Sequence, residues 1–90
     1  MRVALICTDK PNALQIRLDT RADHLAYIAA TGVVEMAGPF LNAEGRMTGS
    51  LIILTVDTLA DAQNWAMLDP YSVAGLFQSV TITEWKKVIG

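Results

Sequence analysis

The feature that most constrains the fold of this chain is a repeated change between strand-like and helix-like patterns within only 90 residues. Short apolar runs bounded by turn formers predict β-strands, whereas apolar residues that recur every three or four positions predict helices. On these patterns we expect strands over residues 2–9, 33–40, 48–56 and 78–88, and helices over residues 13–31 and about 58–68. The order βαββαβ predicts an α+β protein with the ferredoxin-like arrangement, a four-stranded antiparallel sheet that carries two helices on one face.

The ends of the two helices are marked by residues with known terminal preferences. Asn12 is the expected N-cap of the first helix, and Gly32 follows its last residue, where a left-handed backbone is common. Asp57 or Thr58 is the expected N-cap of the second helix.

The strands are apolar on both faces, which a sheet with one solvated face would not be. Val3 and Leu5 point to one side of the first strand while Ala4 and Ile6 point to the other, and residues 51–54 are apolar throughout. Two helices cover only one face, and 52% of the residues are hydrophobic. We therefore expect a second copy of the chain to cover the other face, most simply in a two-fold homodimer.

Composition excludes several classes of protein. The net charge of −2 and the absence of a dense basic run disfavour nucleic-acid binding, and no segment approaches the roughly 20 apolar residues of a membrane helix. The single cysteine, Cys7, excludes an intrachain disulfide and favours a reducing, cytoplasmic location. One histidine and one cysteine far apart in sequence do not form a metal-binding motif. We expect a single domain over residues 1–90.

The segment RLDTRADHLAYI, residues 17–28, contains the only histidine, His24, beside Arg17 and Arg21. Helical spacing places the three side chains on one flank of an apolar stripe that we expect to be buried, formed by Leu14, Leu18, Ala22, Leu25 and Ala29. Spacing alone favours a solvated flank for the three polar residues, with the arginine stems lying over apolar neighbours. The alternative is that they form one wall of a cleft.

Asp69 lies at the end of the second helix, because the residue before Pro70 avoids helical backbone angles. A carboxylate there opposes the helix dipole, so a positive partner such as His24 would explain its position. Asp69 could also cap a short helix or turn from Tyr71 to Gly75, and the two roles are compatible. The loop GRMTGS, residues 45–50, offers Thr48, Gly49 and Ser50 as donors for a small anion, although a plain hairpin connection explains it as well.

Several motifs occur in order along almost the whole chain. They are R-x-x-x-R-x-x-H-L-A-Y (17–27), A-G-P-F (37–40), G-R-M-T-G-S (45–50), W-A-x-x-D-P-Y (65–71), A-G-L-F (74–77) and W-K-K-V (85–88). In this set the chain closely resembles the YciI-like (YCII-related) family. One departure is Glu84, where relatives commonly have proline or a basic residue before the aromatic.

The resemblance implies a ferredoxin-like fold that pairs into a dimeric α+β barrel, and it implies that His24 and Asp69 face a shared pocket. Family members are mainly small bacterial proteins of unestablished activity. Muconolactone isomerases and chloromuconolactone dehalogenases share the barrel. From the arginines and the family motifs together we expect these substrate-binding residues: Arg17, Arg21, Ser50, Tyr71, Gly38 and Pro39.

Two functions fit these residues. In the first, the protein is a small enzyme that needs no metal or organic cofactor, and a His24–Asp69 dyad performs general acid–base chemistry of an isomerase, lyase or dehalogenase type. A guanidinium group of Arg17 or Arg21 would hold a small carboxylated or lactone-type metabolite. In the second, the protein is a non-catalytic module that binds a small anion or assembles into oligomers, and the dyad is a structural ion pair.

Overall fold

The computed structural model describes residues 1–90 and contains a four-stranded antiparallel sheet with three helices. The elements are β1 (Arg2–Asp9), α1 (Leu14–Thr31), β2 (Val34–Leu41), β3 (Met47–Thr55), α2 (Leu59–Leu68), α3 (Pro70–Val73) and β4 (Phe77–Trp85). The strand order is β2-β3-β1-β4, so that β2 and β4 form the edges. This is the predicted ferredoxin-like α+β arrangement, and the short helix expected after Asp69 is present as α3.

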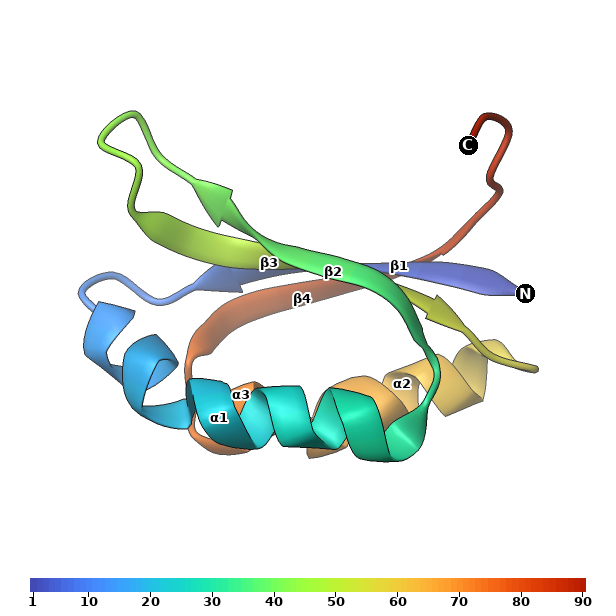
Figure 1. The fold of residues 1–90 in the computed structure, drawn as a ribbon, viewed down its shortest axis with the longest axis horizontal. Coiled ribbons are helices and arrows are strands. Elements are labelled where there is room, and N and C mark those ends of the chain that lie inside the picture. Colours follow the sequence, from blue (N-terminus) through green and yellow to red (C-terminus); the bar gives the residue numbers. More distant parts are fainter.

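All helices lie against one face of the sheet, and no element of the chain covers the opposite face (Figure 1). The core lies between the sheet and α2. It consists of Val3, Leu5, Cys7, Ile52, Leu54, Ala62, Trp65 and Ala66. None of the three helices is both long and apolar enough to cross a membrane.

The predicted element boundaries hold within a few residues, but one predicted helix cap does not. The predicted Asn12 cap is wrong: Asn12 adopts a left-handed backbone with φ of 58°, and the N-cap is Ala13, without a side-chain cap. Asparagine tolerates this conformation better than most residues, so Asn12 serves the turn instead of the helix. Gly32 does end α1 with φ of 66°, and the hydroxyl of Thr58 accepts a hydrogen bond from the Asp61 amide as the cap of α2.

The predicted orientation of α1 is also wrong. The stripe expected to be buried is largely exposed, with 37% exposure for Leu14, 49% for Leu18 and 47% for Leu25. The helix instead turns Arg17 and His24 toward the sheet, and both are buried. Their buried ion-pair partners, described below, offset the cost of removing these polar groups from water.

Candidate active site

A cavity of about 160 Å³ lies between α1, the edge strand β2, β3 and α3. Residues predicted to form the site line it together: Arg17, Arg21, His24, Gly38, Pro39, Ser50 and Tyr71. The remaining wall is mostly apolar and includes Leu25, Ile28 and Ile52. Asp69, the eighth predicted residue, lies behind His24 and is buried.

His24 and Asp69 form a buried pair in which Nδ1 lies 2.7 Å from Oδ1. The same carboxylate oxygen accepts a hydrogen bond of 3.0 Å from the backbone amide of Tyr71. Both roles considered for Asp69, helix cap and histidine partner, are therefore present at one atom. Because an ionised carboxylate only accepts, Nδ1 carries the proton in this pair and Nε2 is left free to accept one.

The second imidazole nitrogen faces open space. Nε2 has no hydrogen-bond partner within the chain. Every side-chain nitrogen or oxygen that is shielded from solvent has a partner, so Nε2 is not one of the shielded atoms. Nε2 is therefore accessible, and His24 lines the cavity. An imidazole oriented by a carboxylate and open at Nε2 is suited to take or give a proton.

Tyr71 fixes the plane of the imidazole. Its ring stacks on that of His24 with centroids 3.9 Å apart and an interplanar angle of 16°, and the Arg17 guanidinium carbon lies 4.9 Å from the tyrosine ring centroid. Burial raises the pKa of Tyr71, an effect that the positive charges of Arg17 and Arg21 partly offset. The phenol therefore stays protonated near neutral pH, and Tyr71 is among the residues that line the cavity.

Arg17 is not a solvated flank residue, which corrects the interpretation that spacing alone favoured. Its Nε and Nη2 donate to the two oxygens of Asp9 at 2.8 Å each, and Nη2 also donates to Ser50 Oγ at 3.0 Å. Burial lowers the pKa of Arg17, but the hydrogen bonds and charge of Asp9 outweigh it, and the net shift is upward. The guanidinium fork is therefore already occupied by a carboxylate of the protein.

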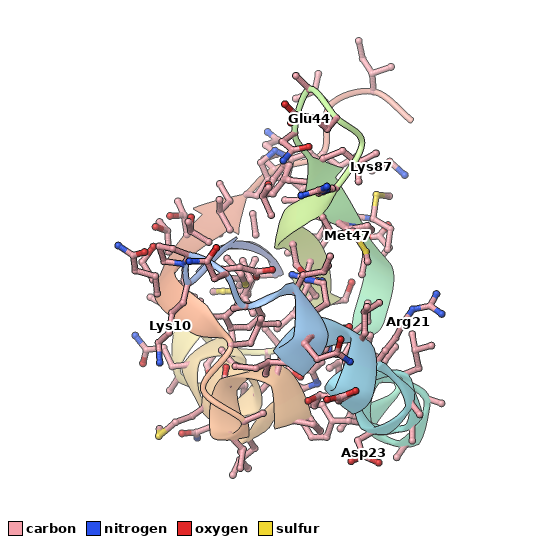
Figure 2. All side chains as sticks on the ribbon, turned by 90° about the vertical axis from the view of Figure 1, so that its left-hand side faces the viewer. Lys10, Arg21, Asp23, Glu44, Met47 and Lys87 are labelled. Carbon is pink, nitrogen blue, oxygen red and sulfur yellow. The ribbon has the colours of Figure 1, made fainter.

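Arg21 differs from Arg17 in being exposed and in having no carboxylate partner. In Figure 2 it extends outward from α1 toward the side of β2, with Met47 further along that side and Asp23 on the opposite side of the helix. Of the two arginines proposed to hold a substrate carboxylate, only Arg21 has its whole guanidinium available.

Asp9 is the residue of this site that sequence reasoning missed. Asp9 is the last residue of β1, where an aspartate is also typical of a turn. Alternation along the strand could have indicated this residue: residues 3, 5, 7 and 9 share one face of β1, and the first three are core residues. A carboxylate on that face is buried, and it requires a cation such as Arg17.

The loop residues proposed as anion donors separate in space. Ser50 lines the cavity, whereas Gly49 packs in the sheet beside Cys7 and Thr48 lines a different hollow of about 630 Å³. That larger hollow lies between the start of α1 and the β2–β3 hairpin and does not contact His24. Asp9 lies in its wall, so the Asp9–Arg17 pair separates the two cavities. No three His, Cys, Asp or Glu side chains come together as a metal-binding group.

Comparison with known proteins decides the family. The YCII-related domain matches residues 1–86. The chain belongs to this family. Protein YciI of Escherichia coli O6:H1 is 33% identical over 98% of this chain and 99% of its own length, and an uncharacterized protein of Haemophilus influenzae is 34% identical over the same shares.

A solved structure extends the comparison to a named enzyme of similar fold. The chain is similar to 5-chloro-2-hydroxyhydroquinone dehydrochlorinase from Burkholderia phenoliruptrix AC1100, in complex with 2,5-dihydroxybenzoquinone. The TM-score is 0.88 and the identity 32%, over 96% of this chain and 94% of the other. This YCII-related chain therefore shares its fold with a dehydrochlorinase.

Proposed function

We propose that this YCII-related protein is an enzyme that moves a proton on a small anionic or carbonyl-containing metabolite, with His24 as the acid or base. The observation that carries the proposal is the 2.7 Å contact between His24 Nδ1 and Asp69 Oδ1, made by an imidazole that lines a cavity. Asp69 fixes the tautomer and orientation of the imidazole, and it stabilises the imidazolium that forms when Nε2 takes a proton. The buried single cysteine is consistent with a cytoplasmic location.

Elimination and isomerisation are the reaction types that this arrangement supports best. In an elimination, Nε2 removes a proton, the C–H electron pair forms the new double bond, and the leaving group departs with its own pair. In an isomerisation, the imidazolium returns the proton at another carbon. The fold neighbour is named for the loss of hydrogen chloride from a chlorinated hydroxyhydroquinone. Small lactones and carboxylates are the other substrates to which the free charge of Arg21 is suited.

The test is turnover of a panel of small substrates by His24→Gln and by the wild-type protein. The panel contains 5-chloro-2-hydroxyhydroquinone, with chloride release as the readout, and muconolactone-type lactones followed by absorbance. We expect kcat/KM to fall by about 10²- to 10⁴-fold in His24→Gln, the usual contribution of a general acid or base. Asp19→Asn, an exposed carboxylate change on the same helix, is the control. Equal turnover by His24→Gln and the wild-type protein would contradict the proposal.

The second candidate function is a non-catalytic module that binds a small anion. It is favoured by one observation: the Asp69 carboxylate joins α1 to the start of α3 through His24 and the Tyr71 amide, as a structural pair would. In that case His24→Ala would lower the free energy of unfolding by about 3 to 5 kcal/mol, because it leaves a buried carboxylate without its partner. A stable His24→Ala variant that binds anions but has lost turnover would favour the enzyme.

A further inference from the structure

A buried three-residue chain of hydrogen bonds reaches the inner wall of the cavity through Arg17 and Ser50, and its first member, Asp9, lies behind that wall and has no role in the dyad chemistry. Asp9 accepts from both Nε and Nη2 of Arg17, and Nη2 donates onward to Ser50 Oγ. Arg17 and Ser50 are each only 3% exposed, and the Asp9 side chain is 6% exposed. The three residues come from the end of β1, from α1 and from β3, so the chain exists only in the folded protein.

The direction of these hydrogen bonds determines what Ser50 offers to the cavity. A guanidinium group has donors and no acceptor, so Ser50 Oγ must accept from Arg17. The hydroxyl then keeps its own proton, and no acceptor of the chain takes it. Since Ser50 lines the cavity, this proton is available to a ligand there. Donation from a cation also polarises the hydroxyl and strengthens it as a donor.

The charges of the site assign different oxygens of a ligand to different residues. Asp9 neutralises Arg17, so the inner wall presents a neutral donor, whereas the unpaired charge of Arg21 stays at the exposed side. A neutral polarised donor suits a carbonyl or phenol oxygen on which charge develops during reaction. A free guanidinium suits a group that is already ionised.

We propose that Asp9 is a positioning residue which, through Arg17, directs the Ser50 hydroxyl proton onto a carbonyl or phenolic oxygen of the substrate. This inference rests on the proposed function and narrows its substrate class. The substrate is a small molecule with an ionised group for Arg21 and a second, carbonyl-type oxygen for Ser50, and its reacting carbon faces His24. Negative charge that develops when His24 removes a proton is then received by the oxygen that Ser50 contacts.

The test measures binding of 2,5-dihydroxybenzoquinone, an acidic quinone whose anion shares its charge between hydroxyl and carbonyl oxygens that Arg21 and Ser50 would contact, by titration calorimetry of the intact protein. We expect Ser50→Ala and Asp9→Asn each to weaken binding about tenfold, the loss of one hydrogen bond to a charged ligand. The double variant should bind no more weakly than Ser50→Ala alone, because Asp9 acts through Ser50 and the two effects are not additive. Ser79→Ala and Asp19→Asn, at exposed positions, should bind as the wild-type protein does.

Four outcomes would overturn the inference. They are unchanged binding by Ser50→Ala, tighter binding by Asp9→Asn, additive losses in the double variant, and no binding by the wild-type protein at millimolar probe. Melting temperatures of all variants distinguish positioning from a merely structural role of Asp9. In a merely structural role, Asp9→Asn would lower the melting temperature and weaken binding, but Ser50→Ala would not weaken binding to a matching extent. Because the readout is binding, it is independent of turnover. If His24→Gln loses activity while Ser50→Ala binds as the wild-type protein does, this inference is rejected and the proposed enzymatic function stands.

Discussion

Tyr71 combines packing and chemistry in one side chain, and the two contributions are separable. Its ring contacts both the His24 imidazole and the Arg17 guanidinium group, while its hydroxyl is not left buried without a partner. We expect Tyr71→Leu to lower the free energy of unfolding by about 2 to 4 kcal/mol, through lost aromatic volume and stacking. Tyr71→Phe keeps the ring and should stay within about 0.5 kcal/mol of the wild-type protein. Urea unfolding measures both, and equal losses in the two variants would show that the hydroxyl, not the stack, stabilises this region.

Cys7 makes stability depend on pH in the alkaline range. The thiol is 2% exposed, and burial, with a contribution from the charge of Asp69, raises its pKa from 9.0 to about 12. Between these values the unfolded chain loses the thiol proton and the folded chain keeps it, so the free energy of unfolding falls as pH rises. The contribution of Cys7 is at most about 1.4 kcal/mol per pH unit.

The variant Cys7→Ala isolates this contribution. Its unfolding free energy should decline less steeply than that of the wild-type protein between pH 9 and pH 11, as measured by denaturant titration at each pH. Only the slopes are compared, since the substitution also removes core volume and shifts the whole curve. Identical slopes would show that the thiol titrates in the folded protein as it does in the unfolded chain.

At the scale of elements, the central strand pairing depends on one glycine. Gly49 of β3 lies opposite Thr8 of β1 and Phe40 of β2, and a Cβ at this position would collide with the backbone carbonyl oxygen of Cys7. Gly49→Ala must therefore separate β1 from β3, and we expect a loss of about 3 kcal/mol or more. Gly38→Ala on β2 is the matched control, because nothing lies within 4 Å of its added Cβ. Thermal unfolding that is equally perturbed in both variants would contradict this explanation.

The element order was predictable from sequence, whereas the rotation of α1 about its axis was not. Periodicity identifies strands and helices because burial of apolar side chains dominates most elements. In α1 that rule selected the stripe containing Leu18 and Leu25, which is exposed, because Arg17 and His24 have buried partners on other elements. Those partners, Asp9 and Asp69, are separated from them in sequence by 8 and 45 residues, and no helical pattern reports contacts of this kind.

The residues that line the candidate site were predicted on a different basis. Spacing alone favoured a solvated flank over a site, and the family motifs supplied His24, Asp69 and the residues that line the cavity. The motifs did not indicate that Asp9 occupies the fork of Arg17, because that contact depends on the packing of α1 against the end of β1. The sequence thus predicted residues that line one cavity, but not the hydrogen bonds among the residues around it.

At the scale of the whole molecule, the uncovered face of the sheet is the main unexplained surface. Ile6, Met36 and Phe40 are between 41% and 49% exposed there, beside the half-buried Leu51. The register places these side chains together: Met36 lies opposite Ile53, Phe40 opposite Gly49, and Ile6 opposite Leu51. A contiguous apolar patch on a sheet face is typical of a protein–protein interface. We therefore propose that a second copy covers this face.

Sedimentation velocity tests this assembly directly. We expect a particle of twice the 9.8 kDa chain mass at micromolar concentration, and a monomer for Ile6→Arg, because a charge buried without a partner within the patch opposes pairing. Leu18→Arg is the matched control, since Leu18 is similarly exposed but lies on α1, on the other side of the sheet. If only Leu18→Arg dissociates the dimer, the interface lies on the exposed stripe of α1 and not on the sheet. A monomeric wild-type protein would contradict the proposed dimer. A dimer lost only in Ile6→Arg would explain why both faces of β1 and β3 are apolar in a chain whose helices cover one.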